Sequence, residues 1–166
     1  IVQDSRNAKI SFTLAAMPAK GSSPGGMTSA ALAVVKAAVA AGVTLSHVNL
    51  MTMDYGASFS AGATMGALAI SAVDGGVAQL KQILPTLTDA QAYAMMGATP
   101  MIGENDVSTE IFSLDDAQML ISYAKQKKLG LVSFWAIQRD RPCGAASDLG
   151  LCSRAQTAPF QFDAIF

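Results

Sequence analysis

The chain has 166 residues, of which 51% are apolar and 14% charged, and its formal net charge is −1. This composition suits one folded domain and carries too little charge for a disordered tail. No cluster of Lys and Arg is interleaved with aromatic residues, which argues against nucleic acid as a partner. The longest apolar stretches are interrupted by Lys36, Asp74 and Lys81, so no membrane span is predicted. Residues 1–4 are neither an initiator Met nor a signal peptide, so we expect a chain that begins part-way through a longer protein.

The first predicted strand and helix occupy the amino-terminal quarter of the chain. Lys9–Pro18 is rich in residues that favour the extended state, and its proline ends the strand. Residues 20–26 are rich in Gly, Ser and Pro and predict a surface loop. Thr28 or Ser29 can then cap a helix that runs to Ala41.

A short apolar run, Val48–Gly56, ends abruptly in a carboxylate, a phenol and a glycine. Such a run is typical of a strand that is covered on both faces. In parallel sheets, chemistry gathers beyond the carboxyl ends of the strands, which is where Asp54 and Tyr55 lie. Asp54 is therefore a candidate functional residue, and a buried structural carboxylate is the alternative.

The next predicted helix is rich in Ala and spans Thr64–Leu84. Gly75 and Gly76 lower the helix propensity of its middle. After this helix, Asp89 can cap a short turn over residues 90–94.

The third strand is predicted within Tyr93–Ile102, and the loop that follows it, residues 103–110, is dense in carboxylates and amides. Such a loop could hold a metal ion. However, it lacks the alternating acid ladder and glycine of a calcium-binding loop, so no metal site is predicted.

The helix with the clearest start and end signals begins at Ser113, which can form a capping box with Asp116. Acidic residues at its start and lysines at its end complement the helix dipole, and Gly130 marks its expected end. The fourth strand is predicted over Leu131–Ile137 and contains the only tryptophan, Trp135. Residues 159–166 predict a last short helix that docks through its Phe side chains.

The only cysteines, Cys143 and Cys152, close a small loop. No His lies near them in the sequence, so a zinc site is not predicted. A disulfide is the preferred interpretation, and it would indicate an oxidising compartment. Two free thiols are the alternative.

Strand and helix alternate along the chain, which predicts an α/β fold with a parallel sheet built from right-handed βαβ units. No Gly-x-Gly-x-x-Gly follows the first strand, which argues against a dinucleotide-binding fold. A free-standing flavodoxin-like sheet with an unrelated ligand is one remaining possibility.

Four stretches carry a more specific resemblance: Val48–Gly56, Gly97–Asp106 with the capped helix behind it, Phe134–Cys143 and Pro159–Phe166. In this order they resemble the carboxyl-terminal half of a bacterial secreted chitinase of glycoside hydrolase family 18. The resemblance implies that residues 1–166 form half of a (β/α)8 TIM barrel, namely strands five to eight with their helices.

The resemblance also implies an activity, which is hydrolysis of β-1,4-linked N-acetylglucosamine polymers by a retaining, substrate-assisted mechanism without a cofactor. The family's catalytic segment, Asp-x-x-Asp-x-Asp-x-Glu, carries the general acid and does not occur in this chain. The chain alone is therefore expected to be inactive. A non-catalytic chitin-binding relative is the alternative function.

The resemblance assigns roles to particular residues. Asp54 matches the acidic residue after strand six, which hydrogen-bonds the distorted sugar. Many family members place a Tyr just before that acid, whereas this chain has Met53 there and Tyr55 just after, so Tyr55 is the candidate for that hydroxyl. Trp135 matches the tryptophan that floors the sugar subsite. The other candidates for substrate contact are Met17, Met51 and Met53, and more weakly Glu104, Asn105 and Asp106, which fall on the loop after strand seven.

Half of a closed barrel has two unpaired edges and an open interior. We therefore expect the chain to need a partner, which is either the amino-terminal half of the barrel or a second copy of itself. Chitin or a chito-oligosaccharide is the expected ligand.

Overall fold

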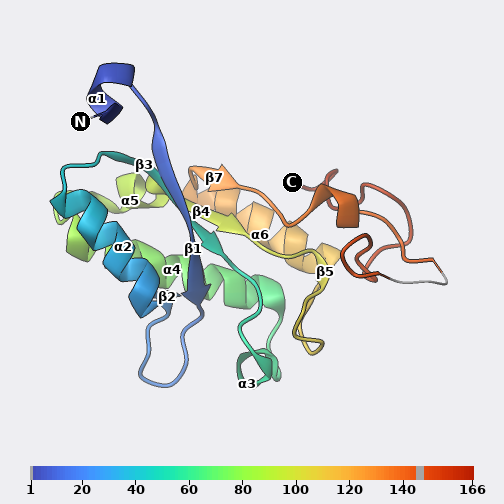
Figure 1. Ribbon diagram of the computed structural model, residues 1–166. Helices are drawn as coiled ribbons and strands as arrows, with labels where there is room; N and C mark the ends of the chain where they lie inside the picture. Colours follow the sequence, from blue (N-terminus) through green and yellow to red (C-terminus); the bar gives the residue numbers. More distant parts are fainter. Residues whose placement is uncertain (1, 145–147) are drawn as a thin grey trace.

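Four parallel strands form the centre of the structure, a computed structural model that describes residues 2–144 and 148–166 (Figure 1). The strands lie side by side in chain order as β1 (Ile10–Met17), β3 (Leu45–Met51), β4 (Met96–Thr99) and β7 (Leu131–Val132). The end of β1 also pairs with a short antiparallel strand, β2 (Gly26–Met27). A separate antiparallel hairpin joins β5 (Gly103–Glu104) to β6 (Ile111–Phe112). The sheet is thus mostly parallel, and the predicted α/β class is confirmed.

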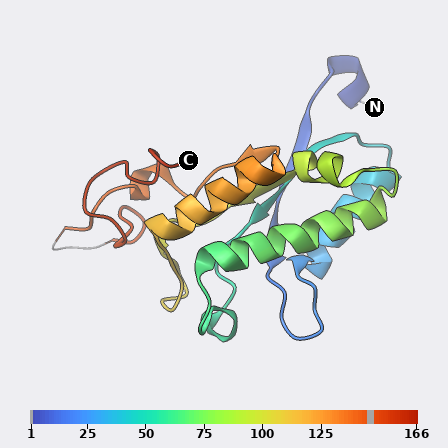
Figure 2. The ribbon, with the colours of Figure 1, turned by 180° about the vertical axis from the view of Figure 1, so that it is seen from behind.

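Helices cover one face of the sheet. The helical segments are α1 (Val2–Arg6), α2 (Ser29–Ala40), α3 (Ala57–Ser60), α4 (Met65–Ile83), α5 (Asp89–Met95), α6 (Leu114–Lys127) and the 3-10 turn η1 (Ile137–Arg139). Figure 2 shows α4, α5 and α6 in front of the strands, whereas Figure 1 shows the strands from the other side. Among the described residues, no helix is long and apolar enough to cross a lipid bilayer.

In the part of the chain that the structure describes, no helix lies over the opposite face of the sheet (Figure 1). Along β1, Phe12 and Leu14 pack toward the core, whereas Ser11, Thr13 and Ala15 are exposed. This alternation follows from the pleat, which sends successive side chains to opposite faces.

A row of polar side chains crosses this open face. The Asn49 amide nitrogen donates to the Thr13 hydroxyl at 3.2 Å and to the Thr99 hydroxyl at 2.7 Å, and the Thr99 hydroxyl lies 2.6 Å from that of Ser133. Thr13, Asn49 and Thr99 belong to β1, β3 and β4, and Ser133 directly follows β7. Polar side chains at these positions satisfy one another, although they lie on a sheet that is otherwise apolar.

Most predicted helix starts are confirmed. The side chains of Thr28 and Thr64 cap α2 and α4, and Ser113 and Asp116 form the predicted capping box of α6. The predicted cap of α5 is wrong, because Thr88 caps it with Gln91 and the Asp89 carboxylate instead pairs with a lysine. The expected end of α6 is also wrong. The helix ends at Lys127, and its C-cap residue is Lys128, which has a left-handed backbone and lies two residues before the predicted glycine.

Two predictions near the carboxyl terminus need correction. β7 stops at Val132 instead of Ile137. Beyond it, the N–H of Ser133 donates to the carbonyl oxygen of Ala98, and a bridge joins Met101 to Trp135. Residues 159–166 form turns and no regular helix. The Asp140 carboxylate accepts the backbone N–H groups of Phe162 and Asp163 and so holds these turns against the segment after β7.

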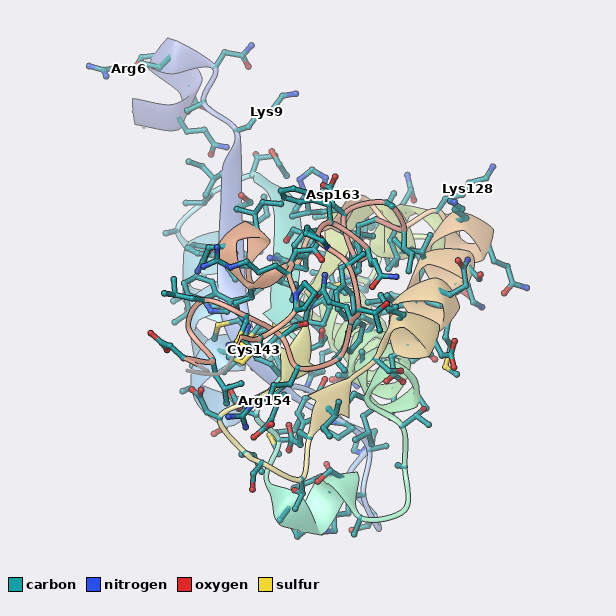
Figure 3. All side chains as sticks on the ribbon, turned by 90° about the vertical axis from the view of Figure 1, so that its right-hand side faces the viewer. Arg6, Lys9, Lys128, Cys143, Arg154 and Asp163 are labelled. Carbon is teal, nitrogen blue, oxygen red and sulfur yellow. A yellow bond between two sulfur atoms is a disulfide. The ribbon has the colours of Figure 1, made fainter. Side chains whose placement is uncertain are left out.

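The predicted disulfide between Cys143 and Cys152 is confirmed, with Cα atoms 5.1 Å apart (Figure 3). Part of the loop that it closes, residues 145–147, lies outside the described residues. The bond ties the segment after β7 to the turns that end the chain.

The glycine pair in α4 lets the helix approach the sheet closely. A Cβ atom at Gly75 would lie 2.4 Å from the carbonyl carbon of Gly25 and 2.5 Å from the nitrogen of Gly26, and one at Gly76 would lie 2.8 Å from Met96. The low helix propensity noted in the sequence is therefore offset by close packing against β2 and β4.

Replacing Gly75 with alanine is expected to lower the free energy of unfolding by about 2 kcal/mol, because the new methyl group meets immobile backbone. Urea denaturation of the two proteins measures the difference. Gly144→Ala is the control, since a Cβ atom there has no neighbour within 4 Å. Equal stabilities for the two alanine variants would contradict the packing argument.

Candidate functional site

A pocket of about 230 Å³ opens at the carboxyl ends of β1 and β3. Its lining brings together four of the residues singled out in the sequence, and the full set is Ala15, Ala16, Met17, Thr28, Met51, Met53 and Asp54. The methionines provide an apolar, polarisable wall, and Asp54 provides the only carboxylate of the lining. The carboxyl ends of parallel strands are the usual place for such a site.

A larger groove, of about 480 Å³, lies on the carboxyl-terminal segment and is lined by Ile137, Gln138, Asp140, Arg141, Pro159 and Phe160. Its carboxylate belongs to Asp140, which is buried and accepts N–H groups from the last turn of the chain. The groove therefore offers no free acid or base. The smaller pocket is the better candidate for chemistry.

Asp54 occupies an unusual backbone conformation just beyond β3. Its φ angle is 51°, in the left-handed region that few residues other than Gly, Asn and Asp adopt. The side chain is exposed, and its Oδ1 atom accepts the backbone N–H of Val107 at 3.3 Å. The backbone turn thus presents a carboxylate at the mouth of the pocket.

Glu110 lies behind this turn and was not singled out in the sequence. Its side chain is fully buried, and its two oxygens accept the N–H groups of Tyr55 at 3.1 Å and Gly56 at 2.7 Å. Burial raises the pKa of the Glu110 carboxyl, although the two N–H bonds act in the opposite direction. In the sequence it is one acid among several in a polar loop, so no local signal distinguishes it.

Tyr55 and Asn105 are both buried. Tyr55 belongs to the hydrophobic core, and its hydroxyl has no hydrogen-bond partner among the described residues. Burial, together with the nearby Glu110 carboxylate, raises the pKa of Tyr55. The Asn105 amide nitrogen donates to the carbonyl oxygens of Met101 and Gly103 at 2.9 and 3.0 Å. Neither side chain lines the pocket, because successive residues after β3 face opposite ways and Asn105 ties down its own turn.

Trp135 lies beyond the end of β7 and is not among the residues that line the pocket. Met51 of β3 pairs with Thr99 of β4, and the bridge between Met101 and Trp135 follows two residues farther along. Trp135 thus lies at the same end of the sheet as the pocket. The indole is 54% exposed, which leaves an aromatic surface available beside the strand ends.

The pocket offers a carboxylate and thioethers, and the exposed indole of Trp135 lies outside its lining. Within residues 2–144 and 148–166, no group of three or more His, Cys, Asp and Glu side chains could hold a metal ion. The arrangement can accept a hydrogen bond from an N–H or O–H group and can stabilise a positive charge. It can also contact the apolar face of a ring.

Comparison with known proteins identifies two relatives that are named as chitinases. The chain is 38% identical over 151 residues to the probable bifunctional chitinase/lysozyme of Escherichia coli (strain K12), a match that covers 86% of this chain. It is 40% identical over 141 residues to endochitinase 11 of Metarhizium anisopliae, which covers 81% of this chain. No protein-family model matches the sequence.

Solved structures agree with these relatives. The fold matches the catalytic domain of the hyperthermophilic chitinase from Pyrococcus furiosus with a TM-score of 0.84 and 34% identity, over 99% of this chain. Catalytic-site mutants of active domain 2 of the thermostable chitinase from that organism, complexed with chito-oligosaccharides, match equally well. This chain spans 52% of the crystallised chitinase domain, and 17% and 26% of the two curated relatives.

Proposed function

This chain is related in sequence and fold to the catalytic domains of family 18 chitinases, and on that basis we propose that it forms part of a chitinase-type glycoside hydrolase. It supplies the carboxyl-terminal half of the catalytic barrel, strands five to eight. The observation that carries the proposal is the pocket that joins Asp54 to the three methionines, at the strand ends of a chitinase-like sheet. Its expected ligand is chitin or a chito-oligosaccharide.

In this proposal the reaction is retaining and uses the substrate's own acetamido oxygen as the nucleophile. That oxygen bonds to the anomeric carbon as the glycosidic bond breaks, and the leaving oxygen takes a proton from an acid outside this chain. Asp54 accepts a hydrogen bond from the acetamido N–H and stabilises the positive charge of the cyclic intermediate. Water then attacks the anomeric carbon, the acetamido oxygen leaves it, and the water gives a proton back to the same acid outside this chain, which restores the acetamido group.

Trp135 and the methionines position the sugar. The exposed indole packs against the apolar face of the pyranose, and Met17, Met51 and Met53 surround the acetyl methyl group. Tyr55 and Asn105 act from within the protein, by fixing the turns on either side of the pocket. No cofactor takes part.

The open face and the edges of the sheet support a complementary half-barrel as the partner. β2 pairs only with Ala16 and Met17, so most of β1 has a free edge, and Leu131 in β7 is exposed. A second copy of the chain is the other possible partner, and native mass spectrometry distinguishes the two. The disulfide supports a secreted, extracellular enzyme.

The test is an assay of the complete barrel on fluorogenic chito-oligosaccharides. Release of the fluorophore with retention at the anomeric carbon, observed by NMR, is the expected result. Binding of chito-oligosaccharide without turnover would instead indicate a chitin-binding lectin. Absence of both would overturn the proposal.

Replacing Trp135 with alanine is expected to weaken binding of chitotetraose by about fivefold, because loss of an aromatic stacking surface costs on the order of 1 kcal/mol. Isothermal titration calorimetry measures the affinity. Phe160→Ala is the matched control, since Phe160 is an aromatic residue of similar exposure in the other groove. Unchanged affinity in the Trp135 variant would exclude the indole from the binding surface.

A further inference from the structure

The β5–β6 hairpin docks on the loop that follows β3. The Glu110 carboxylate binds two N–H groups of that loop, and the N–H of Val107 in turn donates to Asp54 at 3.3 Å. The hydroxyls of Ser60 and Thr109 lie 2.9 Å apart and form a further link. Two carboxylates thus hold the two loops together from opposite sides.

The loop needs such support because its backbone is strained. Asp54 has a φ of 51° and Gly56 a φ of 96°, and a residue with a side chain pays a free-energy cost in this region. The N–H groups that Glu110 accepts belong to the two residues directly after Asp54. Both Glu110 oxygens are used, one for each N–H, so the peptide plane that joins Asp54 to Tyr55 is fixed in orientation.

We propose that Glu110 is a positioning residue that sets the direction of the Asp54 carboxylate. It touches neither the pocket nor the substrate, and it acts through the backbone of Tyr55 and Gly56. The inference rests on the proposed function, because it assigns Asp54 its role in the reaction. It adds a buried carboxylate from the hairpin after β4 to the residues on which that reaction depends.

Asp116 provides a matched control within the same protein. It is also a buried carboxylate that accepts backbone N–H groups, from Gly66 at 2.8 Å and Ser113 at 2.8 Å. Its partners lie at the starts of α4 and α6 and not at the pocket. If a variant of Glu110 lost activity only because the protein became less stable, the matching variant of Asp116 should lose activity in the same way.

The experiment compares Glu110→Gln with Asp116→Asn in the complete barrel. In Glu110→Gln, an NH2 group replaces one carboxylate oxygen and cannot accept a hydrogen bond. One of the two bonds to the N–H groups of Tyr55 and Gly56 is therefore lost, and the turn shifts. We expect Glu110→Gln to lower kcat by about tenfold or more at nearly unchanged KM, because small misplacements of a catalytic group are costly. Asp116→Asn should lower the thermal midpoint and leave kcat near the wild-type value. A wild-type kcat in Glu110→Gln, or an equal loss in both variants, overturns the proposal.

A second measurement needs no variant of Glu110. In the wild-type protein, the amide protons of Tyr55 and Gly56 should shift together in NMR spectra as Glu110 takes up its proton. The shift should occur above the pH range of an ordinary glutamate, because burial raises the pKa of Glu110. Among the described residues, the Asp54 carboxylate and the Tyr55 hydroxyl are the titratable groups that interact with Glu110, and Asp54→Asn is the control for the first.

These measurements separate the two proposals. If the amide protons of Tyr55 and Gly56 followed no carboxyl titration, the proposed role of Glu110 would be overturned, whether or not the protein hydrolyses chitin. A wild-type barrel without hydrolysis would overturn the proposed function, and the amide titration would still decide whether Glu110 holds the turn.

Discussion

Replacing Arg139 with methionine is expected to lower the free energy of unfolding by about 3 kcal/mol, since hydrogen bonds from a buried charge contribute more than neutral ones. The guanidinium is 2% exposed and donates to three carbonyl oxygens, those of Ile102, Glu104 and Leu149. It thereby joins the strand-end loops after β4 to the disulfide-bonded segment. Methionine fills much of the volume but leaves these carbonyl oxygens without their donor.

Thermal and urea unfolding measure this loss, with Arg141→Met as the control. Arg141 is an exposed neighbour whose Nε donates to the carbonyl oxygen of Leu151 alone among the described contacts. Its replacement should cost less than about 1 kcal/mol. Similar losses in the two variants would show that the buried network contributes little.

Local signals in the sequence located the four parallel strands and the starts of α2, α4 and α6. Thr28 and the Ser113–Asp116 pair each make a cap whose donor and acceptor lie within one helical turn, so spacing alone reveals them. The apolar runs likewise located the parallel strands. The ends of elements were less predictable, because the Asp140 carboxylate takes amides from residues some way along the chain.

Such local signals could not predict contacts between residues that lie far apart in the sequence. The β2 edge depends on Gln79, whose side chain binds both the N–H and the C=O of Met27. Nothing near either residue in the sequence indicates this pairing. The same holds for Asp116, which was predicted as a helix cap and also binds the start of α4.

The candidate site likewise contains some residues that local signals predict and others that they do not. That parallel strands end at one edge predicts the grouping of Met17, Met51 and Asp54, which the pocket brings together. Glu110 escaped notice because a carboxylate in a polar loop is ordinarily solvated, and only the folded chain shows that it is buried. The burial of Tyr55 follows from the alternation of side chains after Asp54.

The second large effect is expected at Asp54. Replacing it with asparagine in the complete barrel should lower kcat on chito-oligosaccharides by about 100-fold, which is typical for loss of one group that stabilises developing charge. Asparagine has the same shape, and its amide oxygen can still accept the N–H of Val107. The turn is therefore retained while the negative charge is lost.

KM should change much less than kcat, because the charge matters most when the positively charged intermediate forms. Asp115→Asn is the control, since this exposed carboxylate lies in the first turn of α6 and not at the pocket. A second variant, Asp54→Ala, removes the contact with Val107 as well and should also lower the thermal midpoint. If Asp54→Asn turned over substrate as fast as Asp115→Asn, the negative charge at the end of β3 would have no part in catalysis. The pocket would then bind its ligand by shape alone.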